Sequence, residues 1–139
     1  MPDDLERFVL EQDRDYEQVV DELRRGRKSS HWIWFIFPQI AGLGRSPTAR
    51  TYAISSLDEA EAYLDHPVLG PRLLEAAGTL ADLDPDRPAT EILGDIDAVK
   101  LRSSMTLFAR AAPHRPVFRR ILDRYFGGAA DPATDRLLA

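Results

Sequence analysis

The sequence predicts an all-α fold, a multihelical arrangement with a buried central helix. Apolar residues recur every three or four positions through most of the 139 residues, which is the spacing of helices with one buried face. Serine, aspartate, proline and glycine stand where such helices would begin and end, and no two segments pair convincingly as strands. Because one ordinary domain has about this length, we expect residues 1–139 to form a single helical domain.

The N-terminal part is predicted to contain two helices, over residues 3–10 and about 14–25. Both segments place apolar side chains at helical spacing. Gly26 follows the second segment, at a position where helices commonly stop.

Residues 31–46, "HWIWFIFPQIAGLGRS", form the most ambiguous segment. The continuous apolar run favours a short buried strand, but a strand needs a partner for its backbone groups and none is evident. A helix is therefore predicted, capped by Ser29 or Ser30 and ended by Pro38. Six consecutive side chains point all round a helix, so most aromatics of residues 32–37 should be core.

Helical patterns continue to the C-terminus. Ser46 is a predicted N-cap with Pro47 at the first helical position, Ser56 and Glu59 have the spacing of a capping box, and Asp131 is the predicted cap of the last helix. The predicted segments are residues 46–54, 55–64, 66–83, 89–94, 95–111, 115–128 and 131–138.

The charge distribution is uneven although the net charge is only −5. Residues 23–50 and 100–126 together contain thirteen of the eighteen Lys and Arg but one of the twenty-three acids. If these two basic segments meet in space, they create a local positive field on an acidic protein. Such a field suits a small phosphorylated ligand better than duplex nucleic acid.

Composition excludes several kinds of site. The chain has no cysteine, which excludes thiolate catalysis and iron–sulfur clusters, and its three histidines are scattered, so we expect no metal site and no cofactor. The acidic N-terminal residues lack a secretory signal, and no apolar run reaches membrane-spanning length. We therefore expect a cytoplasmic protein without membrane contact, as a monomer or weak homodimer.

The predicted helix at residues 95–111 carries a polar stripe. Asp97, Lys100 and Ser104 follow one another at i, i+3 and i+7, with Ser103 beside them, on a helix whose other positions are largely apolar. A helix apolar on so many sides should lie inside the fold. The stripe is either an ordinary Asp97–Lys100 pair with serines bonded back to the helix, or part of a ligand site.

The segment "GLGRSPTAR" also permits two interpretations. Gly42 and Gly44 precede a helix start whose backbone N–H groups could hold a phosphate, with Arg45 or Arg50 adding charge. The segment matches neither a P-loop nor a dinucleotide fingerprint. The glycines alternatively serve only to turn the chain.

Four strings carry a family resemblance: "GRKSSHWIWFIFPQIAGLGRS", "YLDHPVLGPRL", "ILGDIDAVKLRSSMTLFARAA" and "FGGAADPAT". Together they resemble the bacterial domain of unknown function 1810 family across nearly the whole chain. The resemblance implies a multihelical fold with a buried central helix and brings no established activity. Members are often labelled calpastatin, but that inhibitory activity belongs to long disordered chains, and this chain is apolar enough to fold.

The order of elements is more distantly similar to the NADAR class of helical proteins linked to ADP-ribose and its N-glycosides. This similarity implies hydrolysis of an N-glycosidic bond, which needs a carboxylate or activated water, cations for phosphates and an aromatic wall for a base. Trp32, Trp34 or Phe35 would be that wall. The catalytic residue is unknown; Asp95, Asp97 and Asp131 are candidates if the fold brings one to a pocket.

Three functions therefore stay open: a nucleotide- or ADP-ribose-related enzyme, a non-catalytic module that binds a small anion or nucleotide, and a protein–protein interaction domain. The first is slightly favoured. The predicted ligand-binding residues are Lys28, Trp32, Trp34, Gln39, Gly44, Arg45, Ser46, Lys100, Ser103 and Ser104.

Overall fold

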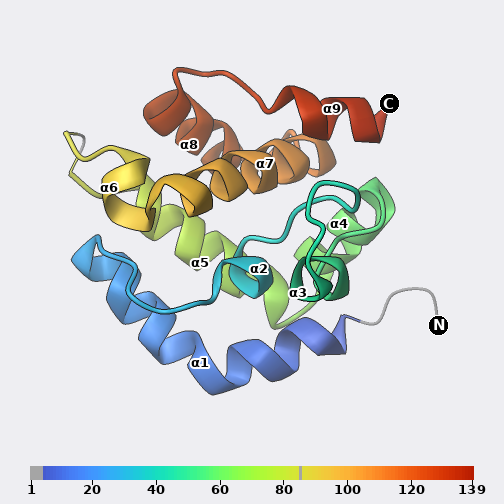
Figure 1. Ribbon diagram of the computed structural model, residues 1–139, viewed down its shortest axis with the longest axis horizontal. Coiled ribbons are helices and arrows are strands. Elements are labelled where there is room, and N and C mark those ends of the chain that lie inside the picture. Colours follow the sequence, from blue (N-terminus) through green and yellow to red (C-terminus); the bar gives the residue numbers. More distant parts are fainter. Residues whose placement is uncertain (1–4, 85) are drawn as a thin grey trace.

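The computed structural model describes residues 5–84 and 86–139, which fold into α-helices joined by short connections, with no β-strand among them (Figure 1). The nine helices within these residues are α1 (Glu6–Arg25), α2 (Ile33–Ile36), α3 (Pro47–Thr51), α4 (Leu57–Asp65), α5 (Leu69–Ala81), α6 (Ala89–Leu93), α7 (Asp95–Ala111), α8 (Pro116–Phe126) and α9 (Pro132–Leu138). None of these helices is both long enough and apolar enough to cross a membrane.

Helix α7 is the centre of the fold, and five other helices, α2, α4, α6, α8 and α9, pack against it. Figure 1 shows α7 crossing the middle of the molecule, with α8 and α9 on one side and α5 and α2 on the other. Its second half is buried almost all round, from Ser103 through Phe108. The predicted all-α architecture with a buried central helix is confirmed.

Several predicted helix ends are also confirmed. Helix α7 spans the predicted residues, and Ser46 caps α3 by accepting a hydrogen bond from Ala49 N (3.1 Å). Asp131 caps α9 through Thr134 N (3.1 Å). Gly26 ends α1 in the left-handed conformation, with a φ of 70°. Short polar side chains and glycine determine these ends locally, which is why the sequence predicts them.

Two predicted helices, over residues 3–10 and 14–25, prove to be the single helix α1, and residues 3 and 4 lie outside the described part of the chain. The junction contains no glycine or proline to break the helix. Gln12 at the junction is buried and donates hydrogen bonds from Nε2 to Phe35 O (2.5 Å) and the Tyr63 hydroxyl (2.9 Å). Tertiary hydrogen bonds thus hold a polar junction residue inside the fold.

The prediction that Ser29 or Ser30 caps the next helix is wrong. Helix α2 begins later, after Trp32, and has no side-chain cap. Both serines instead donate backbone N–H groups to the Glu22 carboxylate, at 2.7 and 3.1 Å, and Trp32 Nε1 donates to the same oxygen at 2.9 Å. The buried Glu22 therefore holds residues 29–32 outside the helix. Only the four residues Ile33–Ile36 form α2.

The connection between α2 and α3 is held by one parallel β-bridge between Ile40 and Ile54. Ile54 N donates to Gln39 O, and Ala41 N donates to Ile54 O, each at 2.8 Å. This bridge fixes the segment carrying Gln39 and the following glycines beside α7. It therefore positions one wall of the cavities described next.

Candidate functional site

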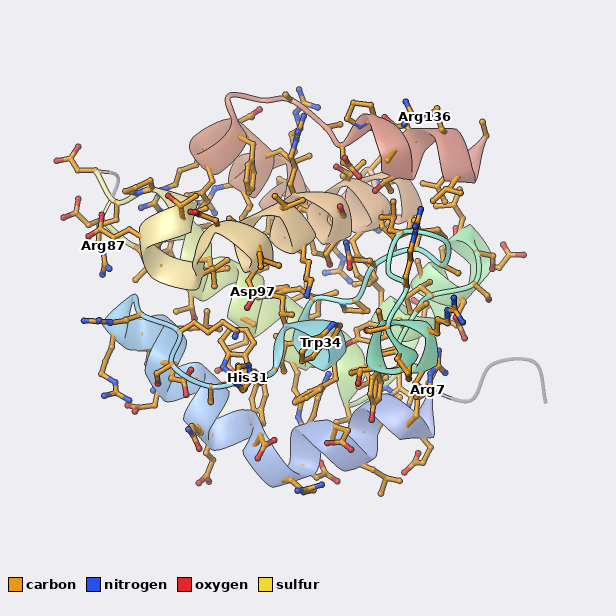
Figure 2. The ribbon with its side chains drawn as sticks, in the orientation of Figure 1. Arg7, His31, Trp34, Arg87, Asp97 and Arg136 are labelled. Atoms are coloured by element: carbon orange, nitrogen blue, oxygen red, sulfur yellow. The ribbon has the colours of Figure 1, made fainter. Side chains whose placement is uncertain are left out.

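Three adjoining cavities meet at Lys100, on the face formed by the first half of α7. The largest, about 610 Å³, lies between α7 and residues 28–34; the second, about 450 Å³, lies between α7, residues 39–44 and the start of α9. The third, which Trp34 also lines, is less open than the other two and, at about 10 Å³, has room for about one water molecule. Figure 2 shows His31, Trp34 and Asp97 near one another in the middle of the view, and all three line the largest of these cavities.

Lys100 lines all three cavities. Its ammonium lies 4.7 Å from the centre of the Trp34 ring, within the range of a cation–π contact. The nearest carboxylate oxygen, from Asp97, is 3.7 Å away, and the ammonium makes no hydrogen bond to any residue of the described chain. The side chain is 24% exposed. The Lys100 ammonium is thus held in position by Trp34 and Asp97 and still has N–H groups available to donate hydrogen bonds.

A second lysine completes a small charge cluster. Lys28 Nζ is 2.8 Å from the other carboxylate oxygen of Asp97, and its side chain is only 7% exposed. Its ammonium also lies 5.2 Å from the centre of the Trp32 ring. Because two lysines share one aspartate, the cluster carries one positive charge in excess at the border of the cavities.

The first half of α7 presents a mixed face to the second cavity. Ile96, Val99, Lys100 and Ser103 stand at i, i+3, i+4 and i+7, so they share one side of the helix, and all four line this cavity. Ile96 is 72% exposed and Val99 is 63% exposed. The expectation that these apolar positions lie inside the fold is therefore wrong, because only the second half of α7 is enclosed by other helices.

The far wall of the second cavity is a hydrogen-bonded junction between α7 and α9. The Asp131 side chain accepts hydrogen bonds from Ser103 Oγ (3.0 Å), Thr134 N (3.1 Å) and Thr134 Oγ1 (2.6 Å), all at one oxygen. Asp131 N donates to Thr106 Oγ1 at 2.9 Å. The carboxylate therefore holds α9 against α7 while bordering the cavity.

Six of the ten predicted ligand-binding residues line these cavities, namely Lys28, Trp34, Gln39, Gly44, Lys100 and Ser103. The other four do not. Trp32 is buried beneath Lys28, Arg45 is exposed on the loop, Ser46 caps α3, and Ser104 is fully buried with no hydrogen-bond partner for Oγ in the described structure. The aromatic run is core apart from Trp34, which is half-buried.

The glycine segment turns the chain closely past α3. A Cβ added to Gly44 would overlap the Ala49 side chain, so only glycine fits there without movement. Ser46 already accepts a hydrogen bond from the first turn of α3, which is five residues long. These contacts favour the turn interpretation over a phosphate cradle.

The two basic segments meet at the site through Lys28 and Lys100, on either side of Asp97. Other cations in them serve the fold. Arg102 donates to the carbonyls of Ala129 and Ala130, each at 2.8 Å, and Arg124 donates to the carbonyls of Leu80, in the last turn of α5, and Leu83, just after it. These two arginines therefore stabilise the fold and do not contribute to the site.

Sequence reasoning missed the apolar wall formed by Leu43, Ile96, Val99 and Ala133. The i, i+3 spacing of Ile96 and Val99 next to Lys100 was a signal for a shared face, but it did not show which side of the helix is open.

The candidate carboxylates Asp95 and Asp97 line the largest cavity, and Asp131 lines the second. Within residues 5–84 and 86–139, no three acidic, histidine or cysteine side chains gather in a way that could hold a metal ion.

Comparisons with known proteins give a family but no activity. The model of the family described as "Protein of unknown function (DUF1810)" matches residues 2–138. The crystal structure of the conserved hypothetical protein Rv1873 from Mycobacterium tuberculosis is similar, with 52% identity, a TM-score of 0.97, and coverage of 99% of this chain and 98% of that chain. No curated protein matches. Neither match is to a NADAR protein, so that similarity stays a prediction.

Proposed function

The chain belongs to the DUF1810 family of proteins of unknown function, and we propose that it binds a small organic anion on the face around Lys100. One observation carries the proposal. The Lys100 ammonium is fixed on the Trp34 ring, borders all three cavities and makes no hydrogen bond within the described structure. A partly buried, oriented cation with hydrogen-bond donors still available is a recurring feature of sites that bind carboxylate or phosphate.

The size of the face suits a small molecule. Cavities of about 610 and 450 Å³ fall in the range typical of ligand pockets, and they share Ile96 and Lys100. A protein–protein interaction domain is less well supported, because the aromatic side chains of residues 32–37 are buried in the core except Trp34, which is half-buried. The joint presence of Trp34 and Lys100 at these cavities favours a ligand site.

Binding is better supported than cleavage of an N-glycosidic bond. Cleavage would need a carboxylate available as acid, base or nucleophile. Asp97 is paired with two lysines, and Asp131 accepts three hydrogen bonds at the α7–α9 junction. Asp95 is exposed at the start of α7, where water screens its charge. Asp97 and Asp131 thus serve the structure, and Asp95 is exposed to water, which supports binding over cleavage.

Replacing Lys100 by methionine should weaken anion binding at least tenfold while preserving the fold. Methionine retains an apolar stem on Trp34 but removes the charge. We expect at least a tenfold increase in Kd, about 1.4 kcal/mol or more. Isothermal titration calorimetry at low salt with inorganic phosphate, AMP, ADP-ribose, acetate and octanoate would measure it, and monitoring for released base or ribose would detect turnover.

Arg24→Ala is the matched control, because it removes one positive charge from an exposed position of α1 outside these cavities. It should bind like the unchanged protein. Arg45→Ala tests separately whether the predicted role of that loop arginine holds. The proposal is wrong if none of the five anions binds, or if Lys100→Met and Arg24→Ala weaken binding equally.

A further inference from the structure

The second cavity joins a cation to an open apolar wall. Val99 precedes Lys100 in the chain, and Ile96 stands one turn before Lys100 on the same side of α7. Leu43 and Ala133 face them across about 450 Å³. Ile96 and Val99 are the most exposed large apolar side chains of the described residues. Apolar groups left in water beside a cavity mark a surface that gains from being covered.

From this juxtaposition we infer that the anion is amphipathic, a monocarboxylate with a medium-length aliphatic chain. The inference rests on the proposed function and names the class of its ligand. The carboxylate would accept hydrogen bonds from Lys100, and the chain would lie along Ile96 and Val99 toward Leu43 and Ala133. The apolar wall starts directly beside the cation, so acid and chain must be adjacent parts of one molecule.

Charge favours a monoanion over a phosphate dianion. The two lysines and Asp97 leave one positive charge, which a single carboxylate balances. Asp131 borders the same cavity, and Asp95 borders the adjoining one. A second negative charge on the ligand would therefore meet carboxylates without a further cation to offset them.

The shape of the wall favours an aliphatic chain over a nucleobase. The Lys100 ammonium covers one face of the Trp34 ring at 4.7 Å, so a base cannot stack on that face. Leu43 and Ala133 add aliphatic groups to the lining of the second cavity beside the polar Asp131, and no aromatic ring is among its lining residues. Methylene groups pack well against such a wall, and they lose nothing by lacking hydrogen-bond partners there.

Calorimetric titration with acetate, hexanoate, octanoate and inorganic phosphate tests the inference. We expect affinity to rise about two- to fourfold for each methylene that becomes buried, so octanoate binds best. Val99→Ser should weaken octanoate binding about tenfold and leave acetate binding unchanged. Lys100→Met should weaken binding of every carboxylate. Leu10→Ser alters an exposed leucine of α1 away from these cavities, and it should change neither octanoate binding nor acetate binding.

Other outcomes separate this inference from the proposed function. If phosphate binds as tightly as octanoate, depends on Lys100 and ignores Val99→Ser, the proposed function stands and the inference is wrong. If no anion binds in a Lys100-dependent way, both are wrong. Light scattering after size-exclusion chromatography tests whether a second copy of the chain covers the apolar wall. A dimer that Val99→Ser dissociates would show that it does, and this result would also overturn the inference.

Discussion

Replacing Gly70 by alanine should lower the free energy of unfolding by about 2–3 kcal/mol, although alanine normally stabilises a helix. Gly70 lies in the first turn of α5, where this helix passes the end of α4. A Cβ added to Gly70 would overlap the backbone carbonyl oxygen of Leu64, so the two helices would have to separate. Backbone cannot move aside as cheaply as a flexible side chain, and both helices pack in the core.

Gly78→Ala is the matched control, since Gly78 belongs to the same helix and a Cβ there meets no atom within 4 Å. This variant should gain up to about 1 kcal/mol from helix propensity. Urea denaturation followed by circular dichroism would give both values. Equal stabilisation by the two alanines would show that α4 and α5 separate freely at Gly70 and would refute the close packing.

The helix ends that could be predicted are those set by residues within a few positions of the end. Ser46, Ser56 and Asp131 each cap a helix as predicted, because the capping oxygen and the capped N–H groups lie three residues apart. The start of α2 could not be predicted from its neighbours. There the backbone N–H groups of Ser29 and Ser30 bond to Glu22, which lies on the preceding helix.

The candidate site was predictable in part for the same reason. The polar stripe around Lys100 and its neighbour Trp34 could be noticed as residue types, but their contact spans α7 and α2 and depends on the fold. The sequence indicates the pair of Asp97 with Lys100, but it does not indicate the nearer partner, Lys28. Lys28 comes from the connection between α1 and α2, which the fold brings beside α7. Periodicity shows that Val99 shares a face with Lys100, whereas only the arrangement of α9 and residues 39–44 leaves that face open.

Glu22→Gln should remove about 3 kcal/mol of stability at neutral pH, and this loss should disappear in acid. The Glu22 side chain is fully buried and faces no cation in an ion pair within the described structure. Burial alone raises the pKa of its carboxyl. Hydrogen bonds from the Ser30 hydroxyl, Ser29 N, Trp32 Nε1 and Gln18 outweigh burial and lower this pKa from 4.5 to about 2.

The sign of the pH dependence follows from that difference. The unfolded chain binds a proton at Glu22 near pH 4.5, whereas the folded protein resists protonation until about pH 2. The stabilisation is therefore complete above about pH 5 and is lost as the pH falls from there toward 2. Chemical denaturation of both proteins between pH 7 and pH 2 should show their stability difference closing over this interval.

Glu17→Gln, an exposed substitution on the same helix, should give a pH profile parallel to that of the unchanged protein. A Glu22→Gln deficit that stays constant from pH 7 to pH 2 would contradict the account, because lost packing has no such pH dependence. The carboxylate also holds the segment that leads to Lys28 and Trp34. Octanoate affinity of Glu22→Gln should therefore fall even at pH 7, because the segment that carries Lys28 and Trp34 loses its anchor.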